Sequence, residues 1–426
     1  MVESKSVFAR TMTRYLWQQM QDVSKMGGVT KVTKRLACEG ATRPELEFVL
    51  ACGRALVKPE AKEDVRLLIQ NRLDWSEAMA VAEHHRLSPT VYEMVANAAR
   101  DLVSPAQLNA LREATTRSTT SSMVLLHELL RLQQLFEGAH LLIIPYKGPI
   151  LAWIAYGSFV RREYSDLDFV VEQKFIPEVV SLLKVSGYSP QFDLREVHDG
   201  KKESAPGQYS FLSNPQKILV EIHSERTLRY FPKPIDFQVL ASRSMIVEIG
   251  GQRLRTFSVE DTLVMLCVHG AKHFWERLNW VLDIAKLATV QEVNWPLALE
   301  IAGEMESTRV LLLGLYLAHD LFGAPLPEPV LRAISRNGAV GKLAEKVCDR
   351  YARISDPDEG VLQRAMFRIQ SRDGIGQGLR HTLWLALSPT ESDRGTIYLP
   401  RWLSPLYALV RPLRLLREYG SGLKRR

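Results

Sequence analysis

Cysteine is scarce in this chain. Its 426 residues include four, Cys38, Cys52, Cys267 and Cys348, which are widely scattered and form no C-x-x-C pair. Structural zinc sites and small disulfide frameworks are built from closely spaced cysteines, so the sequence indicates neither. A reducing compartment is the expected setting, and we predict a cytoplasmic protein.

Long apolar runs are also lacking. A membrane-spanning helix needs about 18 or more consecutive apolar residues, and no segment of the chain supplies them. The first twenty residues, MVESKSVFARTMTRYLWQQM, have no continuous apolar core of the kind found in secretory signals. We therefore expect no transmembrane segment and no secretion.

The sequence has no strong excess of one charge. Lys and Arg number 55 against 48 Asp and Glu, a formal net charge of +7. A mildly basic balance suits contact with phosphates or anionic surfaces without requiring it. Dedicated RNA-binding modules interleave aromatic and basic residues. That pattern is not evident in the sequence, so RNA binding is the function that the sequence favours least.

The hydrophobic spacing changes along the chain. Residues 1–44 are basic and weakly patterned, 45–138 have apolar residues at helical intervals, 139–255 mix short apolar runs with helical segments, 256–395 are helical again, and 396–426 form a basic, leucine-rich tail. The spacing predicts a partly disordered N-terminal segment, followed by a compact α/β core between two helical regions. The expected fold class is α+β, with a small mixed β-sheet flanked by helices.

The basic tail allows two interpretations. Trp402, Tyr407 and the leucines can pack on the folded domain while the arginines stay solvated. Alternatively, the tail makes a peripheral contact with a membrane or with RNA. The first interpretation is favoured.

An aspartate pair stands at the start of the apolar run DLDFVV. Side chains alternate along a strand, so Asp166 and Asp168 point to the same face. Like charges this close repel each other, and a divalent cation between them removes the repulsion. Two such carboxylates can chelate Mg²⁺ or Mn²⁺ for phosphoryl transfer. The D-x-D motif alone is weak evidence, because it also occurs on solvated strand ends.

Three neighbouring features strengthen the metal interpretation. Lys147 and Gly148 lie between a predicted strand and a predicted helix, where glycine lets the backbone approach a phosphate and the helix N-terminus offers free N–H groups. Arg162 just precedes the aspartates and is suited to a phosphate contact. Glu221 and His223 share one face of a later apolar strand, and a sheet that places this strand beside the first would form a three-carboxylate site.

Together these residues resemble a family of uncharacterised bacterial nucleotidyltransferases in the DNA polymerase β-like nucleotidyltransferase superfamily. The family pattern is K-G, then R-x-x-x-D-x-D, then E-x-H, which stands here as Lys147–Gly148, Arg162–Asp168 and Glu221–His223. The flanking segments LDWSEAMAVAEHHRLSP and VHGAKHFWERLNWVLDIAKL are similar too, as is the tail LPRWLSPLYALVRPLRLL. The resemblance thus extends over most of the chain.

The resemblance implies a polymerase β-like palm core and a definite chemistry. A nucleoside monophosphate would pass from an NTP to an acceptor hydroxyl, with release of pyrophosphate. Asp166 and Asp168 would bind Mg²⁺ or Mn²⁺, and Glu221 would be a third ligand or the base. The other pattern residues would bind the nucleotide: Lys147, Gly148, Arg162 and His223. The acceptor stays open between a protein side chain, an RNA end, a sugar and a small molecule.

The superfamily's usual Gly-Ser turn has two candidate positions here. Gly157–Ser158 is literally Gly-Ser but lies closer to Asp166 than usual, whereas Lys147–Gly148 has the strand before it and the helix after it. We favour Lys147–Gly148, since phosphate binding needs a strand-to-helix turn. The missing serine leaves a second hypothesis open, a catalytically weak or inactive nucleotide-binding relative.

Overall fold

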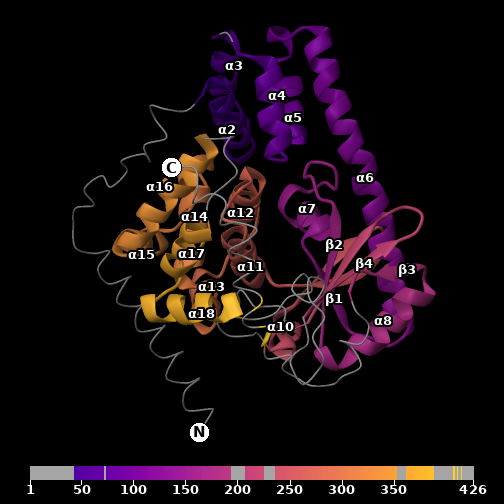
Figure 1. Ribbon diagram of the computed structural model, residues 1–426. Coiled ribbons are helices and arrows are strands. Elements are labelled where there is room, and N and C mark those ends of the chain that lie inside the picture. The colour runs from indigo at the N-terminus through magenta and orange to yellow at the C-terminus, as the bar shows by residue number, and fades with distance from the viewer. Residues whose placement is uncertain are drawn as a thin grey trace. The chain divides into compact units, whose positions relative to one another are not determined.

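The protein is described by a computed structural model over residues 43–71, 73–192, 207–224, 236–352 and 361–387, with isolated residues at 406, 407, 410 and 414 (Figure 1). The predictions for the N-terminal segment and the basic tail therefore concern residues that lie almost wholly outside the described part of the chain.

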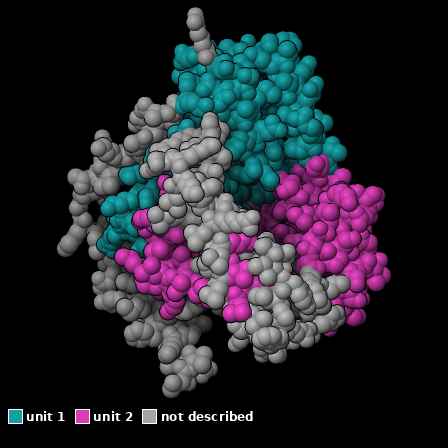
Figure 2. Space-filling view, in the orientation of Figure 1, with its two compact units in different colours: residues 1–120, 152–163, 259–354 teal, residues 121–151, 164–258, 355–426 magenta. Residues whose placement is uncertain are grey.

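The chain divides into two compact units, each assembled from three separate segments. Unit 1 contains residues 1–120, 152–163 and 259–354, and unit 2 contains 121–151, 164–258 and 355–426 (Figure 2).

Unit 2 is built on a five-stranded sheet of order β1-β2-β5-β4-β3. The sheet is mixed, because β2 and β5 run parallel while the other neighbours are antiparallel. The small mixed sheet predicted from the sequence is thus present, with helical segments before and after it in the chain. Its strands are β1 (Ile143–Tyr146), β2 (Asp166–Val171), β3 (Tyr188–Pro190), β4 (Gln208–Ser213) and β5 (Leu219–His223).

One face of this sheet is the core of unit 2. Burial alternates along β4, as expected for a strand with one covered face. On the covered face, the ring of Phe169 in β2 meets that of Phe136 in an edge-to-face contact with centroids 5.5 Å apart. Phe136 belongs to α6 (Pro105–Gly138), so the C-terminal part of this long helix covers the sheet. The opposite face carries the polar residues described below together with buried apolar ones such as Ile144 and Val170.

A separate hairpin of β6 (Met245–Ile249) and β7 (Gln252–Thr256) was not predicted. Gly250 and Gly251 join its strands with positive φ angles, the conformation that a tight hairpin turn requires. The Thr256 hydroxyl donates a hydrogen bond of 2.8 Å to the carbonyl of Pro145, which fixes the hairpin beside β1.

Helices make up the rest of both units. In unit 1 they pack around the fully buried Trp275, and a Cβ added at Gly270 would lie 2.4 Å from its ring, so this helix contact needs glycine. Among the described helices, none is both long and apolar enough to cross a membrane. Besides α6, the α-helices are α2 (Pro44–Val57), α3 (Lys62–Gln70), α4 (Trp75–His84), α5 (Ser88–Ala98), α7 (Gly148–Tyr156), α8 (Ile176–Val185), α10 (Phe237–Arg243), α11 (Val259–Lys272), α12 (Leu278–Val290), α13 (Trp295–Glu304), α14 (Thr308–Phe322), α15 (Glu328–Arg336), α16 (Gly338–Ala352), α17 (Val361–Gln370) and α18 (Ile375–Leu387).

Candidate functional site

The strand register brings the acidic residues of the sequence motif to one face of the sheet. β2 and β5 pair in parallel with Asp168 opposite Glu221 and Val170 opposite His223. Paired residues on neighbouring strands point the same way, and residues two apart share a face. Asp166, Asp168, Glu221 and His223 therefore lie on the face opposite Phe169.

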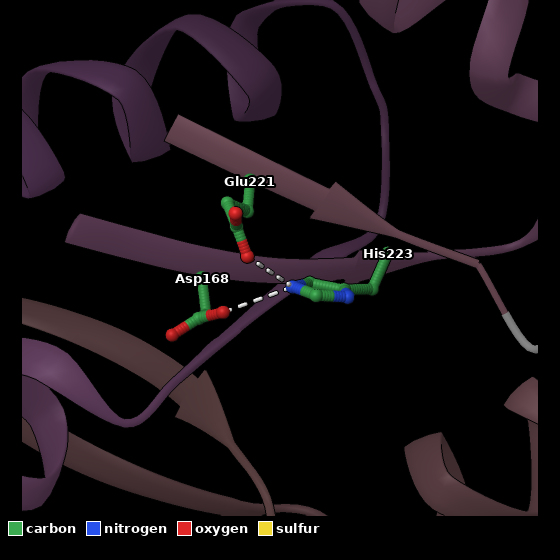
Figure 3. A group of neighbouring side chains, drawn as sticks. All are labelled: Asp168, Glu221 and His223. Carbon is green, nitrogen blue, oxygen red and sulfur yellow. Dashed lines mark hydrogen bonds and ion pairs between the residues drawn. The ribbon is translucent and has the colours of Figure 1, made fainter. Parts of the chain in front are cut away.

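Three of these side chains meet directly (Figure 3). His223 Nε2 lies 2.9 Å from Asp168 Oδ1 and 3.5 Å from Glu221 Oε2. One potential ligand atom from each of the three residues falls within 4.8 Å of the others. The imidazole nitrogen thus points between two carboxylates that come from adjacent strands. Asp168 and His223 are buried, while Glu221 is partly exposed.

The pKa values of the group are coupled. Burial on its own would lower the pKa of His223, but the hydrogen bonds to Asp168 and Glu221 outweigh it, so the pKa is raised above its ordinary value. Burial would raise the pKa of Glu221, yet the hydrogen bond with His223 reverses the sign and lowers it. Both shifts favour a protonated imidazole beside an ionised Glu221, and the positive charge of the imidazole offsets the repulsion between neighbouring carboxylates.

A tight turn lies next to this group. Lys147 and Gly148 connect β1 to α7 with φ angles of 57° and 42°, in the left-handed region. Lys147 Nζ is 3.7 Å from Asp168 Oδ1. A Cβ added at Gly148 would stand 3.2 Å from the backbone oxygen of Asp166, a tight contact in addition to the strained φ. The strand-to-helix turn predicted from the sequence is present, and it touches the aspartate strand.

The alternative Gly-Ser pair has a different structural setting. Gly157 follows the last residue of α7, and its N–H donates to the carbonyl of Trp153 as in a helix C-terminus. Its φ is 61°, and an added Cβ would meet nothing within 4 Å. Gly157 therefore ends the helix, whereas Gly148 begins it.

Residues 71–323 of the chain match the family described as "Uncharacterised nucleotidyltransferase", which is more than half of its length. The chain belongs to this nucleotidyltransferase family. The resemblance to an uncharacterised nucleotidyltransferase family is thereby confirmed, while its bacterial origin and its place in the polymerase β-like superfamily stay predictions; the matched region includes every site residue predicted from the motif.

Among solved structures, this member of the nucleotidyltransferase family is similar to "an antigenic nucleotidyltransferase-like protein from Paracoccidioides brasiliensis". The two are 15% identical with a TM-score of 0.33, and the match covers 50% of this chain and 96% of that chain. No curated protein is significantly similar in sequence.

The donor atoms of the site fit a divalent cation. Two carboxylates and one imidazole are ligands for Mn²⁺ and related ions, and carboxylates alone suit Mg²⁺. Asp166 adds a further carboxylate on the same face, and its charge acts on the same tyrosine, Tyr146, as the charges of Asp168 and Glu221. Burial first, and then the charges of Asp168, Glu221 and Asp166, raise the pKa of the Tyr146 phenol.

Two residues that support the site were not predicted from the nucleotidyltransferase motif. Gln208 of β4 donates from Nε2 to Glu221 Oε2 over 2.9 Å, and so fixes this carboxylate. The Tyr146 ring lies edge-to-face with His223 at 5.7 Å and stacks on Phe257 at 4.8 Å. Tyr146 directly precedes the motif lysine, but Gln208 could be placed only once the β4–β5 register was known.

Arg162 has a well-defined partner inside unit 1. Its guanidinium donates to both carboxylate oxygens of Asp283 in α12, over 2.8 and 3.0 Å, and Tyr156 donates to Asp283 Oδ1 over 2.8 Å. Asp283 is fully buried and Arg162 is 8% exposed. The neighbouring Arg161 pairs with Glu93 at 3.0 Å. The structure thus places the motif arginine in a buried bidentate ion pair that secures residues 152–163 to α12.

Proposed function

We propose that the chain is a metal-dependent nucleotidyltransferase of the polymerase β type, which moves a nucleoside monophosphate from an NTP to an acceptor hydroxyl. One observation carries the proposal. The β2–β5 register sets Asp168 opposite Glu221, with Lys147 of the strand-to-helix turn 3.7 Å from the same aspartate. A carboxylate pair beside a lysine and a helix N-terminus is suited to a metal-bound triphosphate.

Each residue has a proposed task. Asp166 and Asp168 hold Mg²⁺ or Mn²⁺, Glu221 is a third ligand or the base, and the imidazole of His223 contributes a ligand atom or orients the carboxylates. Lys147 and the N–H groups at the start of α7 bind phosphate oxygens, because Gly148 lets the backbone come close. The bound ion would neutralise charge on the phosphate oxygens.

The proposed reaction forms one bond and breaks one. The acceptor oxygen attacks the α-phosphorus, the bond from that phosphorus to the bridging oxygen of the β-phosphate breaks, and pyrophosphate leaves with the bonding electron pair. The hydroxyl proton passes to a carboxylate, for which Glu221 is the candidate because its lowered pKa keeps it ionised at neutral pH. Positioning and charge neutralisation are the main contributions of the protein.

A second candidate function rests on the same imidazole. A protonated His223 between Asp168 and Glu221 offsets part of their negative charge, so it competes with a metal ion for the same oxygens. Such a chain would bind nucleotide weakly and transfer little, as a sensing or scaffold protein.

Label transfer distinguishes the two candidates. The purified chain is incubated with α-labelled NTPs, Mg²⁺ or Mn²⁺, and cell extract as a source of acceptors. The matched variants are Asp168→Asn in the site and Glu178→Gln on the exposed side of α8. We expect metal-dependent transfer that falls on the order of a hundredfold in Asp168→Asn and is unchanged in Glu178→Gln.

Transfer that survives in Asp168→Asn would show that the reaction occurs elsewhere. Metal-dependent NTP binding without transfer to any acceptor would favour the sensing or scaffold candidate. Absence of NTP binding at all would refute both.

The thiols suggest where the protein works. Cys52 and Cys267 are buried and form no disulfide. Free buried thiols are usual in a reducing compartment, which supports the proposal of a cytoplasmic protein.

A further inference from the structure

Helix α18 presents its apolar side chains outward. Ile375, Leu379 and Leu383 are 71%, 53% and 60% exposed, and Leu387 continues the series at 38%. These residues are spaced by four, so they form one stripe along the helix. Soluble helices normally bury such a stripe.

The opposite side of α18 is the buried one. Gly378 faces α17, the helix beside it in Figure 1, and a Cβ there would come 2.4 Å from the carbonyl oxygen of Ile369. His381 on the same side is 7% exposed. The helix therefore packs on α17 through Gly378, and its leucines stay in contact with solvent.

Exposed apolar residues are also concentrated in this part of the sequence. Of the sixteen exposed large hydrophobic residues in the described part of the chain, six fall within residues 366–387. The two outside the stripe are Trp384 and Met366, both 46% exposed. A continuous exposed stripe such as that of α18 marks an interaction surface, unlike single apolar residues scattered over a surface.

The charge of the protein is concentrated in the same part of the sequence. Residues 361–426 contain twelve Lys and Arg against four Asp and Glu, whereas residues 1–360 contain 43 against 44. The whole positive excess of the chain thus belongs to residues 361–426, whose first part, 361–387, carries the stripe with four arginines and one aspartate. Arg380, on α18 itself, is exposed between Leu379 and Leu383.

We infer that α18 is a docking surface for an anionic lipid bilayer. An interfacial helix combines leucine and tryptophan on one side with basic residues, and lies in the plane of the headgroups. The basic excess gives the charge complementarity with an anionic leaflet. RNA would also attract these arginines. A phosphate backbone, however, offers no apolar surface against which the leucines could be buried, whereas a bilayer does, so the stripe favours lipid over RNA.

Vesicle flotation of the full chain tests the inference. The vesicles are pure phosphatidylcholine, or phosphatidylcholine mixed with phosphatidylglycerol. We expect flotation with the mixed vesicles only, weakened by high salt. The variant L379N/L383N should lose at least about tenfold in vesicle affinity, because two leucines no longer enter the bilayer. The control V185N/V290N changes two exposed valines on other helices and should bind like wild type.

Three results would overturn the inference. The first is no flotation with anionic vesicles, or the same flotation in L379N/L383N as in wild type. The second is a lower melting temperature for L379N/L383N than for V185N/V290N without vesicles, which would show that the chain's own segments cover the stripe. The third is binding to a labelled RNA but not to vesicles. The inference is independent of the transfer chemistry, so the Asp168→Asn variant should still float with the anionic vesicles.

Discussion

At the scale of single residues, His223 allows two carboxylates to stay close together in a buried setting. Its Nε2 lies within reach of both Asp168 and Glu221. Gln208 donates a hydrogen bond to Oε2 of Glu221 and so holds that carboxylate in place. Side chains that orient metal ligands affect metal affinity almost as strongly as the ligands themselves. The support of Glu221 is therefore a point where the metal proposal can be tested without removing a ligand.

Gln208→Leu should weaken Mn²⁺ binding by roughly ten- to a hundredfold, because Glu221 loses its hydrogen bond and its fixed orientation. Calorimetric titration with Mn²⁺ measures the change. Ser210→Ala is the matched control, since Ser210 belongs to β4, as Gln208 does, and pairs with Glu221 of β5. Equal Mn²⁺ affinity in the two variants would argue against Glu221 as a ligand.

The two glycine turns can be separated by substitution. Alanine at Gly148 or at Gly157 adopts a positive φ, and each variant should lose about 1 kcal/mol of unfolding free energy. Only Gly148→Ala also places a methyl group 3.2 Å from the Asp166 carbonyl. We expect NTP affinity, measured by equilibrium binding, to fall about tenfold in Gly148→Ala and to hold in Gly157→Ala. The reverse result would identify Gly157–Ser158 as the phosphate turn.

At the scale of elements, the unit-1 segment 152–163 is fixed by a buried ion pair. Asp283 of α12 accepts from Tyr156 at the end of α7 and from Arg162 in the loop that follows. Removing one partner of a buried pair leaves an uncompensated charge, whereas replacing both with apolar residues is often neutral. Substitution of Arg162 should thus lower the stability of the fold, whereas substitution of an arginine that only binds phosphate should lower nucleotide affinity instead.

Arg162→Met should therefore lower the unfolding free energy by about 3 to 5 kcal/mol, and Arg162→Met/Asp283→Leu should recover most of it. Urea denaturation of both variants measures the effect. If Arg162→Met keeps wild-type stability but loses NTP affinity, the arginine serves the nucleotide as the sequence pattern implied.

How well each feature could be predicted depends on how far apart in the sequence its residues lie. Period-two alternation was enough to place Asp166 with Asp168, and the strand of Glu221 was evident from its apolar run. The hairpin of β6 and β7 carried a local signal as well, a Gly-Gly turn between alternating residues. The Arg162–Asp283 pair spans 121 positions, and no local pattern specifies a contact of that range. The same holds for His223, whose position between two carboxylates depends on the parallel β2–β5 register.

At the scale of the whole molecule, each unit needs chain segments that are far apart in sequence. In unit 1, His85 follows α4 and is 1% exposed, and its Nδ1 accepts a weak hydrogen bond of 3.4 Å from the N–H of Leu278 at the start of α12. Its ring also meets Tyr351 of α16 edge-to-face at 5.5 Å. The burial of His85 thus reports on the assembly of two segments.

Burial, with further contributions from His84 and Arg277, lowers the pKa of His85 to about 3. In the unfolded chain this histidine takes up a proton near pH 6.5. The stability that it provides by staying neutral is therefore complete above about pH 6.5 and is lost as the pH falls from there toward about 3. At pH 5 the loss is on the order of 2 kcal/mol, from about 1.4 kcal/mol per pH unit.

His85→Gln cannot be protonated, so its unfolding free energy should fall less than that of wild type between pH 7.5 and pH 5. The comparison is made by urea denaturation at both pH values, with His140→Asn as a control at an exposed histidine. An equal fall in wild type and His85→Gln would mean that water reaches His85 and that its two segments separate before unit 1 unfolds. A larger fall in wild type would show that residues 43–120 and 259–354 close over this ring as one cooperative unit.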